Sequence, residues 1–413
     1  MNEPVRVMLL LSSLNGGGAE RVAVHLLNRC DPALVDVRMG LLRREGPFLA
    51  EADPTRIEAA TIGKRWFGHQ GHNSGFYRAD RLVASTVLAP INFAHMIRTH
   101  RPQVVMSFLK GVSLLTWMAV NRVGDARPRW IVREGNNTDA VIEDEVSHPL
   151  GRAIVKGITR KAYRSADCFL ANSHEMARGL QQRLALDGDR VRVIQNPIDV
   201  ARVQRLAREP LRDAPKRPFI LNVGRLEYQK GHDVLLKAFA ASEAARDLDL
   251  VILGKGSLEG ELKRLAGELG VADRVIFPGF IPNPWAWLAR AKLFALSSRW
   301  EGFPSVVAEA LACGTPALVT SCDFGPAEVV EHGQSGWVVP PDSVEAFGSA
   351  MDQLLRRPDL TARFAANGPA RAALFDVDSM VEAYTDLFFE QARVLRPARL
   401  PIEAPDDVAV AAA

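Results

Sequence analysis

Cysteine is scarce in this 413-residue sequence, which contains only four. None belongs to a CxxC pair or stands beside histidines in a zinc-like cluster; the four are Cys30, Cys168, Cys313 and Cys322. This spacing favours buried, reduced thiols over a disulfide framework or a structural zinc site. Acidic metal patterns are equally weak. Asp247 and Asp249 form a DxD pattern, but they span an expected helix end and strand start, and Asp187 and Asp189 lie in a turn.

The sequence also lacks a long apolar run and a large net charge. Lys110 interrupts the best candidate, residues 104–120, so no segment has the length of a transmembrane helix. The apolar opening, residues 5–11, is short and leads into three glycines, so we interpret it as a strand and not as a signal peptide. A net charge of +3 is too small to indicate nucleic-acid binding. We expect a cytoplasmic protein, either free or at the inner face of the cell membrane.

What the sequence does contain is a repeated alternation of short apolar strands and amphipathic helices, with 47% apolar residues overall. The length suits two domains, and the alternation predicts an α/β fold with parallel sheets. Asn196-Pro197-Ile198-Asp199 has the composition of a hinge, and the basic stretch 202–217 favours a boundary nearby. Residues 397–413, with proline, aspartate and an alanine-rich end, are predicted to be disordered.

The most informative stretch runs from Ser297 to Gly314. Residues 293–296 form an expected strand, and Pro304 can occupy the first turn of a helix over 305–312. Glu301 therefore falls in the strand-to-helix turn, and Glu309 lies about a turn and a half into the helix. In open α/β sheets, ligands bind at such turns, where carboxylates can accept hydrogen bonds from hydroxyls. The alternative for two glutamates is a solvated helix surface.

Two further loops favour a ligand site over a solvated helix surface. The pattern N-V-G-R-x4-K-G places Arg225 and Lys230 in a loop that opens a helix. Gly16, Gly17 and Gly18 lie between the first strand and the first helix, where backbone N–H groups and the helix dipole can bind an anion. This run is not GxGxxG, which disfavours a dinucleotide site, and a tight strand-to-helix turn is the alternative.

Glu301-x7-Glu309 within SSRWEGFPSVVAEALACGTP, together with Arg225 and Lys230 in NVGRLEYQKG, resembles the retaining GT-B glycosyltransferases of family 4, the group 1 glycosyl transferases. The resemblance runs from SLNGGGAERVAVHLLN to about residue 340. It implies two Rossmann-like domains whose parallel sheets face an interdomain cleft. Residues 1–197 would form the acceptor-binding domain and 198–377 the nucleotide-sugar-binding domain, and a helix over 378–396 would cross back to the first domain.

The resemblance also implies roles for single residues. Arg225 and Lys230 would stabilise the departing diphosphate, Glu301 would contact a hydroxyl of the donor sugar, and Glu309 would bind the ribose hydroxyls. The other expected donor contacts are Gly16, Gly17, Gly18, Gly254, Lys255, Gly256, Gly302, Phe303, Pro304 and Ser305. Many relatives carry a histidine after the strand at 130–132. This sequence has Arg133 and Glu134 there, and Glu134 is our candidate for the sugar contact.

These roles predict a retaining transferase that moves a hexose or N-acetylhexosamine from a nucleoside-diphosphate sugar to a glycan or lipid-linked acceptor. UDP is favoured over GDP, and because two cations face the diphosphate, we expect transfer without a metal or other cofactor. The alternatives are a UDP-sugar epimerase of the same fold and a non-catalytic carbohydrate-binding or scaffold protein. The combined E-x7-E and R-x4-K patterns argue against the first, and the presence of Arg225, Lys230 and Glu309 argues against the second.

One charged segment is not explained by the donor site. Between 152 and 164 five cations occur without an acidic residue, and they are Arg152, Lys156, Arg160, Lys161 and Arg164. Their spacing places them along one side of a helix, with Ile154 and Ile158 elsewhere. Such a basic amphipathic helix could contact the acceptor or an anionic membrane, and a solvated helix face is the alternative. The basic and aromatic loop 61–83 has the same two interpretations.

Overall fold

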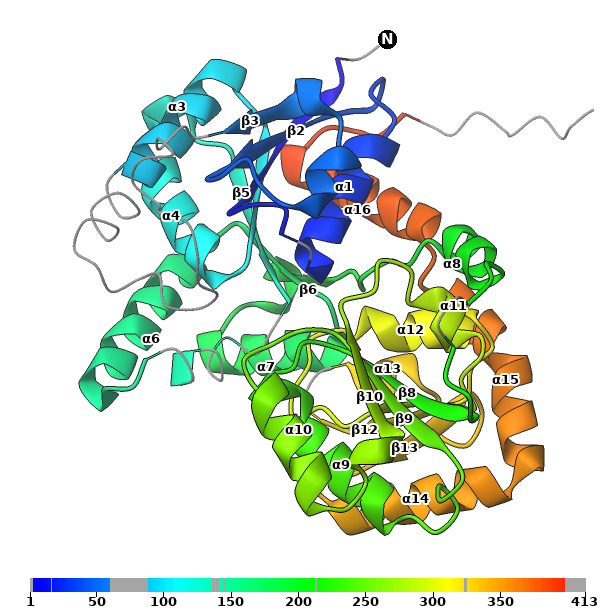
Figure 1. Ribbon diagram of the computed structural model, residues 1–413. Coiled ribbons are helices and arrows are strands. Elements are labelled where there is room, and N and C mark those ends of the chain that lie inside the picture. Colours follow the sequence, from blue (N-terminus) through cyan, green and yellow to red (C-terminus); the bar gives the residue numbers. More distant parts are fainter. Residues whose placement is uncertain are drawn as a thin grey trace, which may run out of the picture.

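The computed structural model folds the chain into two α/β domains, which lie one above the other in Figure 1. It describes residues 3–15, 17–59, 88–135, 146–211, 214–322 and 325–397, together with positions 138, 142 and 143. The predictions for Gly16, for the loop 61–83 and for residues 398–413 lie outside these described residues.

The N-terminal domain is built on a parallel sheet with the strand order β3-β2-β1-β4-β5-β6-β7. The strands are β1 Val5–Leu11, β2 Val35–Leu41, β3 Ile57–Ala59, β4 Val104–Phe108, β5 Arg129–Glu134, β6 Cys168–Ala171 and β7 Val191–Val193. Its helices are α1 Gly18–Arg29, α3 Ala89–His100, α4 Lys110–Val120, α6 Pro149–Arg164 and α7 His174–Leu184. Alternate residues of β1 enter two different apolar clusters, one with α1 and the other with α3, α4, α6 and α7. Burial on both faces explains why β1 is almost entirely apolar.

The C-terminal domain repeats this plan with the strand order β10-β9-β8-β11-β12-β13. The strands are β8 Phe219–Val223, β9 Asp249–Leu253, β10 Val275–Gly279, β11 Leu293–Leu296, β12 Ala317–Thr320 and β13 Gly336–Val339. The helices are α8 Val200–Ala207, α9 His232–Ala241, α10 Glu259–Glu268, α11 Trp285–Leu288, α12 Ser305–Ala312, α13 Pro326–Val329, α14 Val344–Arg356 and α15 Pro358–Ala373. The α/β class and the two Rossmann-like domains expected from the sequence are therefore confirmed.

Two helices of this domain differ from the sequence-based expectation. The stretch 202–217, interpreted as a low-complexity boundary, begins inside α8, whose N-terminus is capped by Asp199 through a 2.9 Å hydrogen bond from the Arg202 N–H. The segment before the expected helix 378–396 carries no helix prediction, yet it forms α15, which contains Pro369. Tertiary packing explains α15, because Phe364 and Ala372 are fully buried in the domain core.

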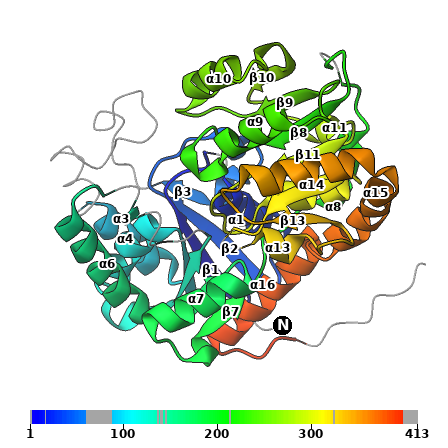
Figure 2. The ribbon, with the colours of Figure 1, turned by 90° about the horizontal axis from the view of Figure 1, so that it is seen from below.

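The last helix, α16 (Val377–Ala392), lies in the N-terminal domain. Met380, Tyr384, Leu387 and Phe388 are buried in the same apolar cluster as β1 and α1. Figure 2 shows α16 running along the N-terminal domain after the chain has left α15 in the other domain. Helix α16 thus packs in the same core as β1 and α1. The chain therefore crosses between the domains a second time after α15, and this crossing ties the two domains together.

Replacement of Leu387 by alanine tests this packing. Leu387 is 4% exposed, so Leu387→Ala should lower the free energy of unfolding of the N-terminal domain by about 2–5 kcal/mol, through lost burial and the cavity left behind. Leu395→Ala is the matched control, because Leu395 is 90% exposed and its loss should change stability by about 0.5 kcal/mol or less. Denaturant titration followed by circular dichroism measures both. Equal effects of the two substitutions would contradict the assignment of α16 to this core.

Candidate functional site

The turn between β11 and α12 places Glu301 against the loop that carries Lys230. Glu301 is 5% exposed, and its Oε1 lies 2.5 Å from Lys230 Nζ and accepts a 2.7 Å hydrogen bond from Ser298 Oγ. Ser297 Oγ donates to the carbonyl of Gly231 at 2.8 Å, which fixes the two loops to each other. Lys230 and Glu301, which are 71 residues apart, therefore form one nearly buried ion pair at the start of α12.

The Lys230 loop is shaped by a glycine that no other residue could replace without strain. Gly231 has φ of +60°, and a Cβ there would overlap the carbonyl of Ser297. Arg225 lies at the other end of this loop, is exposed, and donates from Nη2 to Gln229 Oε1 at 3.0 Å. The structure thus brings Arg225, Lys230 and Glu301 to one place, as the pattern of the sequence requires.

The loop of Gly254, Lys255 and Gly256 backs the Arg225 loop. The Leu226 N–H donates to the carbonyl of Lys255 at 3.0 Å. A side chain at Gly254 would overlap the carbonyl of Gly224, and one at Gly256 would overlap the backbone of Leu226. The two loops therefore pack backbone against backbone, and the Lys255 side chain is exposed.

Across the domain junction, the start of α1 faces the start of α12. A Cβ added to Gly18 would lie 3.9 Å from Ser305 Oγ and 3.2 Å from Asn196 Nδ2. Gly302 approaches the other domain still more closely, because a Cβ there would overlap the carbonyl of Gly135, the residue after β5. Two helix N-termini, both favourable for negative charge, therefore converge from opposite domains. Of the glycines predicted for the donor site, Gly18 lies beside Ser305 of the opposite domain, and Gly17 lies beside Glu20.

Glu134 occupies a different environment. It is 2% exposed, and its Oε1 accepts a hydrogen bond from the hydroxyl of Tyr163 on α6. Burial raises the pKa of Glu134 to about 7, although the Tyr163 hydroxyl and the nearby Lys110 and Arg133 oppose the shift. Its carboxyl group faces the interior of the N-terminal domain, where the described groups that act on it are Tyr163, Thr138, Lys110 and Arg133.

Arg133, next to it, has a structural role that the sequence did not reveal. It is 1% exposed, donates from Nε to the Tyr384 hydroxyl at 2.7 Å, and donates from Nη2 to Asn196 Oδ1. One buried guanidinium thus joins β5, the segment that crosses between the domains, and α16. No motif could have indicated this, because its partners lie 63 and 251 residues away.

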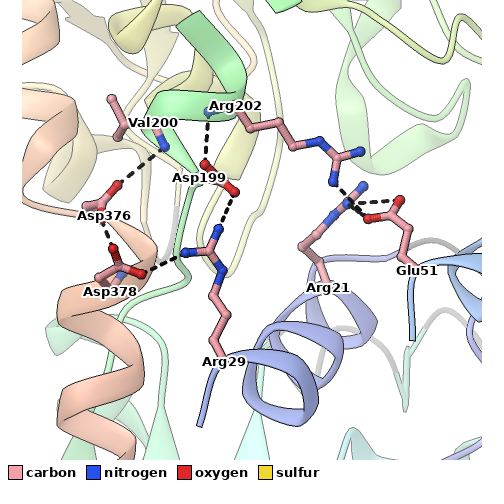
Figure 3. Close-up of polar contacts among 8 residues, drawn as sticks. All are labelled: Arg21, Arg29, Glu51, Asp199, Val200, Arg202, Asp376 and Asp378. Carbon is pink, nitrogen blue, oxygen red and sulfur yellow. Dashed lines mark hydrogen bonds and ion pairs between the residues drawn. The ribbon is translucent and has the colours of Figure 1, made fainter. Parts of the chain in front are cut away.

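Glu309 lies on α12 next to a network of charges from both domains. Burial raises its pKa, and the Trp285 indole, Arg21 and Arg202 oppose the shift. Arg21 of α1 and Arg202 of α8 both pair with Glu51 Oε2, at 3.1 and 2.8 Å (Figure 3). In the same view, Arg29 of α1 binds Asp199 at 2.5 Å and Asp378 of α16 at 2.7 Å.

A second interdomain contact lies at α7. The carboxylate of Glu328, on α13 of the C-terminal domain, accepts hydrogen bonds from the backbone N–H groups of His174 at 3.0 Å and Glu175 at 2.8 Å. Ser173 caps the same helix through the N–H of Met176. The backbone N–H groups at the N-terminus of α7 therefore have hydrogen-bond partners in both domains. Glu328 has no signal in the sequence, because it lies 154 and 153 residues from its two partners.

The five predicted cations of the basic helix lie on α6, at the outer edge of the N-terminal domain (Figures 1 and 2). Lys156 pairs with Glu143 at 2.8 Å, Arg164 donates to the Leu184 carbonyl at 2.9 Å, and Arg152 donates to the Val146 carbonyl. Arg160 and Lys161 are exposed. The buried face of α6 consists of Thr159, Ala162 and Tyr163.

Three apolar residues of α6 are exposed, which the sequence pattern did not indicate. Leu150, Ile154 and Ile158 are 64%, 53% and 46% exposed, at a spacing of four residues, and so form an apolar stripe on the solvent side. No helix within the described residues is long and apolar enough to cross a bilayer. The described residues also contain no group of three or more His, Cys, Asp or Glu side chains placed to hold a metal ion.

Comparison with known proteins agrees with this geometry. The sequence-family model described as Glycosyltransferase Family 4 matches residues 16–202. The family model described as Glycosyl transferases group 1 matches residues 203–371. The chain is 30% identical over 249 residues to the N-acetylgalactosamine-N,N'-diacetylbacillosaminyl-diphospho-undecaprenol 4-alpha-N-acetylgalactosaminyltransferase of Campylobacter jejuni; the match covers 59% of this chain and 67% of that protein. It is 26% identical to the lipopolysaccharide core biosynthesis glycosyltransferase LpsE of Rhizobium meliloti, over 90% of this chain and 95% of that protein.

The fold has solved counterparts as well. The crystal structure of Anabaena HepE in complex with UDP superposes with a TM-score of 0.70 at 18% identity, over 94% of this chain and all of that one. At this identity the likeness concerns the fold, which is that of the GT-B glycosyltransferases. The relatives compared by sequence are named as transferases, and neither is named as an epimerase or a scaffold. The chain belongs to the family 4 glycosyltransferases, the group 1 glycosyl transferases, and is a glycosyltransferase with the GT-B fold.

Proposed function

We propose that this glycosyltransferase moves a hexose or an N-acetylhexosamine, with retention of configuration, from a UDP-linked donor to a glycan or lipid-linked acceptor. The observation that carries the proposal is the 2.5 Å pair of Lys230 and Glu301, with Arg225 in the same loop, at the start of α12. Retention is carried over from the resemblance to the retaining enzymes of the family. UDP is chosen because the Anabaena structure is a complex with UDP. A lipid-linked acceptor is chosen because the name of the Campylobacter relative contains a diphospho-undecaprenol.

The cations have a definite task in this chemistry. As the bond from the anomeric carbon to the phosphate oxygen breaks, negative charge develops on the departing diphosphate. Arg225 and Lys230 stabilise that charge, and the N–H groups at the starts of α1 and α12 point to the same region. The acceptor hydroxyl forms the new bond to the anomeric carbon, and its proton passes to the departing phosphate. No metal is needed in this scheme, because two cations already face the diphosphate.

The remaining donor contacts follow from the same arrangement. Glu301 accepts a hydrogen bond from a donor-sugar hydroxyl, and Glu309 from the ribose hydroxyls. The nucleotide lies along Gly254, Lys255 and Gly256, and the sugar and phosphates along the segment from Gly302 to Ser305. For Glu134, contact with the sugar stays a prediction that requires its carboxyl group to leave Tyr163, its partner in this structure.

Alanine at either cation tests the assignment. We expect Arg225→Ala and Lys230→Ala each to lower kcat by about two to three decades, because each removes one preorganised electrostatic contact to the developing charge. Lys237→Ala is the matched control, since Lys237 is an exposed lysine on α9 of the same domain. The assay measures the UDP that the purified protein releases from the donor in the presence of the acceptor. Unchanged kcat in both site variants would refute the proposed roles.

The expected independence from metal has its own test. After dialysis against EDTA, transfer should continue at its original rate, because positively charged side chains perform the task that a divalent ion would otherwise perform. The assay is repeated with Mg²⁺ or Mn²⁺ added back. A loss of activity with EDTA that either ion restores would show that the two cations are insufficient.

We further propose that α6 docks on an anionic lipid surface and so brings the enzyme to a lipid-linked acceptor. Three exposed apolar side chains, Leu150, Ile154 and Ile158, can enter the headgroup region, while Arg160 and Lys161 on the same helix attract acidic lipids. A helix that only faced water would gain nothing from three exposed aliphatic side chains at this spacing.

Vesicle sedimentation tests the docking. The protein should bind vesicles that contain phosphatidylglycerol more strongly than vesicles of phosphatidylcholine alone. Lys161→Gln should weaken this binding about fivefold, the effect of about 1 kcal/mol per cation, and the double variant Ile154→Gln, Ile158→Gln should weaken it further. Leu374→Gln, at a leucine that is 64% exposed in the C-terminal domain, is the control for a general loss of surface apolarity. Equal binding by all four proteins would contradict the assignment to α6.

A further inference from the structure

Glu20, in the first turn of α1, folds back over Gly17. A Cβ added to Gly17 would overlap its Oε2, so the carboxylate occupies the space beside that glycine. It accepts hydrogen bonds from the backbone N–H groups of Glu20 itself and of Gly17, the N-cap of α1. A glutamate that reaches back from the third helical position to the N-cap N–H is half of a capping box, which stabilises a helix end.

Capping alone does not explain the charges that surround this carboxylate. The positive charges of Arg133 on β5 and of Arg225 in the opposite domain act on it and favour its ionised form. Burial raises the pKa of Glu20, and the two N–H groups and these two arginines oppose the shift. Within the described residues, the start of α1 also lies beside Asn196 and Ser305, as the distances from Gly18 show. Glu20 therefore places a negative charge at the junction where two helix N-termini and Arg225 converge.

We propose that the Glu20 carboxylate occupies part of the diphosphate site in the nucleotide-free enzyme and must release the N–H groups of α1 when the donor enters. This inference rests on the proposed function, which places the donor phosphates between the glycine loop and Arg225. A diphosphate and an ionised carboxylate repel each other at such a distance. Glu20 therefore either turns away or binds a proton when the nucleotide enters, and in both cases it weakens nucleotide binding compared with an uncharged side chain.

If Glu20 binds a proton when the nucleotide enters, the direction in which nucleotide affinity changes with pH is determined. The negative charge of the nucleotide raises the pKa of Glu20 further, so the complex holds more protons than the free enzyme between the two pKa values. Nucleotide affinity should then fall as the pH rises through that interval, and binding should take up protons from the buffer. A glutamate that only caps α1, at a distance from the nucleotide, would give neither effect.

Glutamine at this position separates the two roles. Glu20→Gln keeps a side-chain oxygen that can accept the hydrogen bond from the Gly17 N–H, since glutamine also serves in capping boxes, but it removes the charge. Glu268→Gln makes the same chemical change on the surface, because Glu268 is exposed near the end of α10. Thermal melting of the three proteins shows whether the Glu20 variant keeps its fold.

Isothermal titration with UDP provides the test, in two buffers that differ in ionisation enthalpy and contain no phosphate. We expect Glu20→Gln to bind UDP about tenfold more tightly than the wild-type chain, the size expected when one like charge is removed at close range. We also expect it to take up fewer protons. Comparison of the proteins cancels the protonation of UDP itself, and Glu268→Gln should match the wild type in both respects.

The outcomes separate the inference from the function on which it rests. If the wild-type chain binds UDP and Glu20→Gln binds it equally or more weakly, with the same proton uptake, the inference is overturned and the proposed function stands. If the wild-type chain does not bind UDP at millimolar concentration, the proposed function fails and the inference fails with it. Tighter binding by Glu20→Gln with the normal proton uptake would show that the carboxylate repels the nucleotide without binding a proton, which supports displacement.

Discussion

The close approach of the two domains at positions without side chains is the constraint on which the rest of the site depends. Gly302 meets the carbonyl of Gly135, and Gly18 lies against Asn196 and Ser305, so the carboxyl end of β5 touches the turn after β11. This contact places the turn that carries Glu301, the partner of Lys230, near the start of α1 in the other domain. A methyl group at position 302 would have to move the backbone, and with it every distance across the junction.

Polar contacts, and not a continuous apolar core, hold that junction on its outer sides. The ion pair of Arg29 with Asp199, the N-cap of α8, is partly exposed, and such pairs add little to stability. Glu328 is different in kind, because it satisfies two N–H groups of α7 that helix geometry leaves without partners. Both sets exist only while the domains keep their present orientation. They therefore favour one arrangement over others without making it permanent, as expected for domains that must admit a donor.

The local patterns of the sequence were sufficient to predict the alternating elements and the loops of Arg225, Lys230 and Glu301, because strand, turn and cap signals are short-range. Long-range partnerships left no such signal. Glu134 turned out to bond Tyr163, and Arg133 joins residues far apart in the chain. For α6, periodicity grouped the cations and isoleucines correctly but could not tell which side the domain would bury. The helix α15 is not evident from the sequence because Gly368 and Pro369 interrupt it, and burial of Phe364 and Ala372 in the domain core compensates.

Two groups of the proposed donor site already have partners in this structure. Lys230 is neutralised by Glu301, and N–H groups at the start of α1 are bound by Glu20. A bound diphosphate would replace these partners, so part of the energy of its new contacts offsets the contacts that are lost. Ground-state binding would then be weaker than the number of contacts suggests. As the glycosidic bond breaks, the charge on the leaving group grows while the internal partners stay the same. The balance then shifts toward the leaving group, and interactions that contribute little in the ground state contribute most in the transition state.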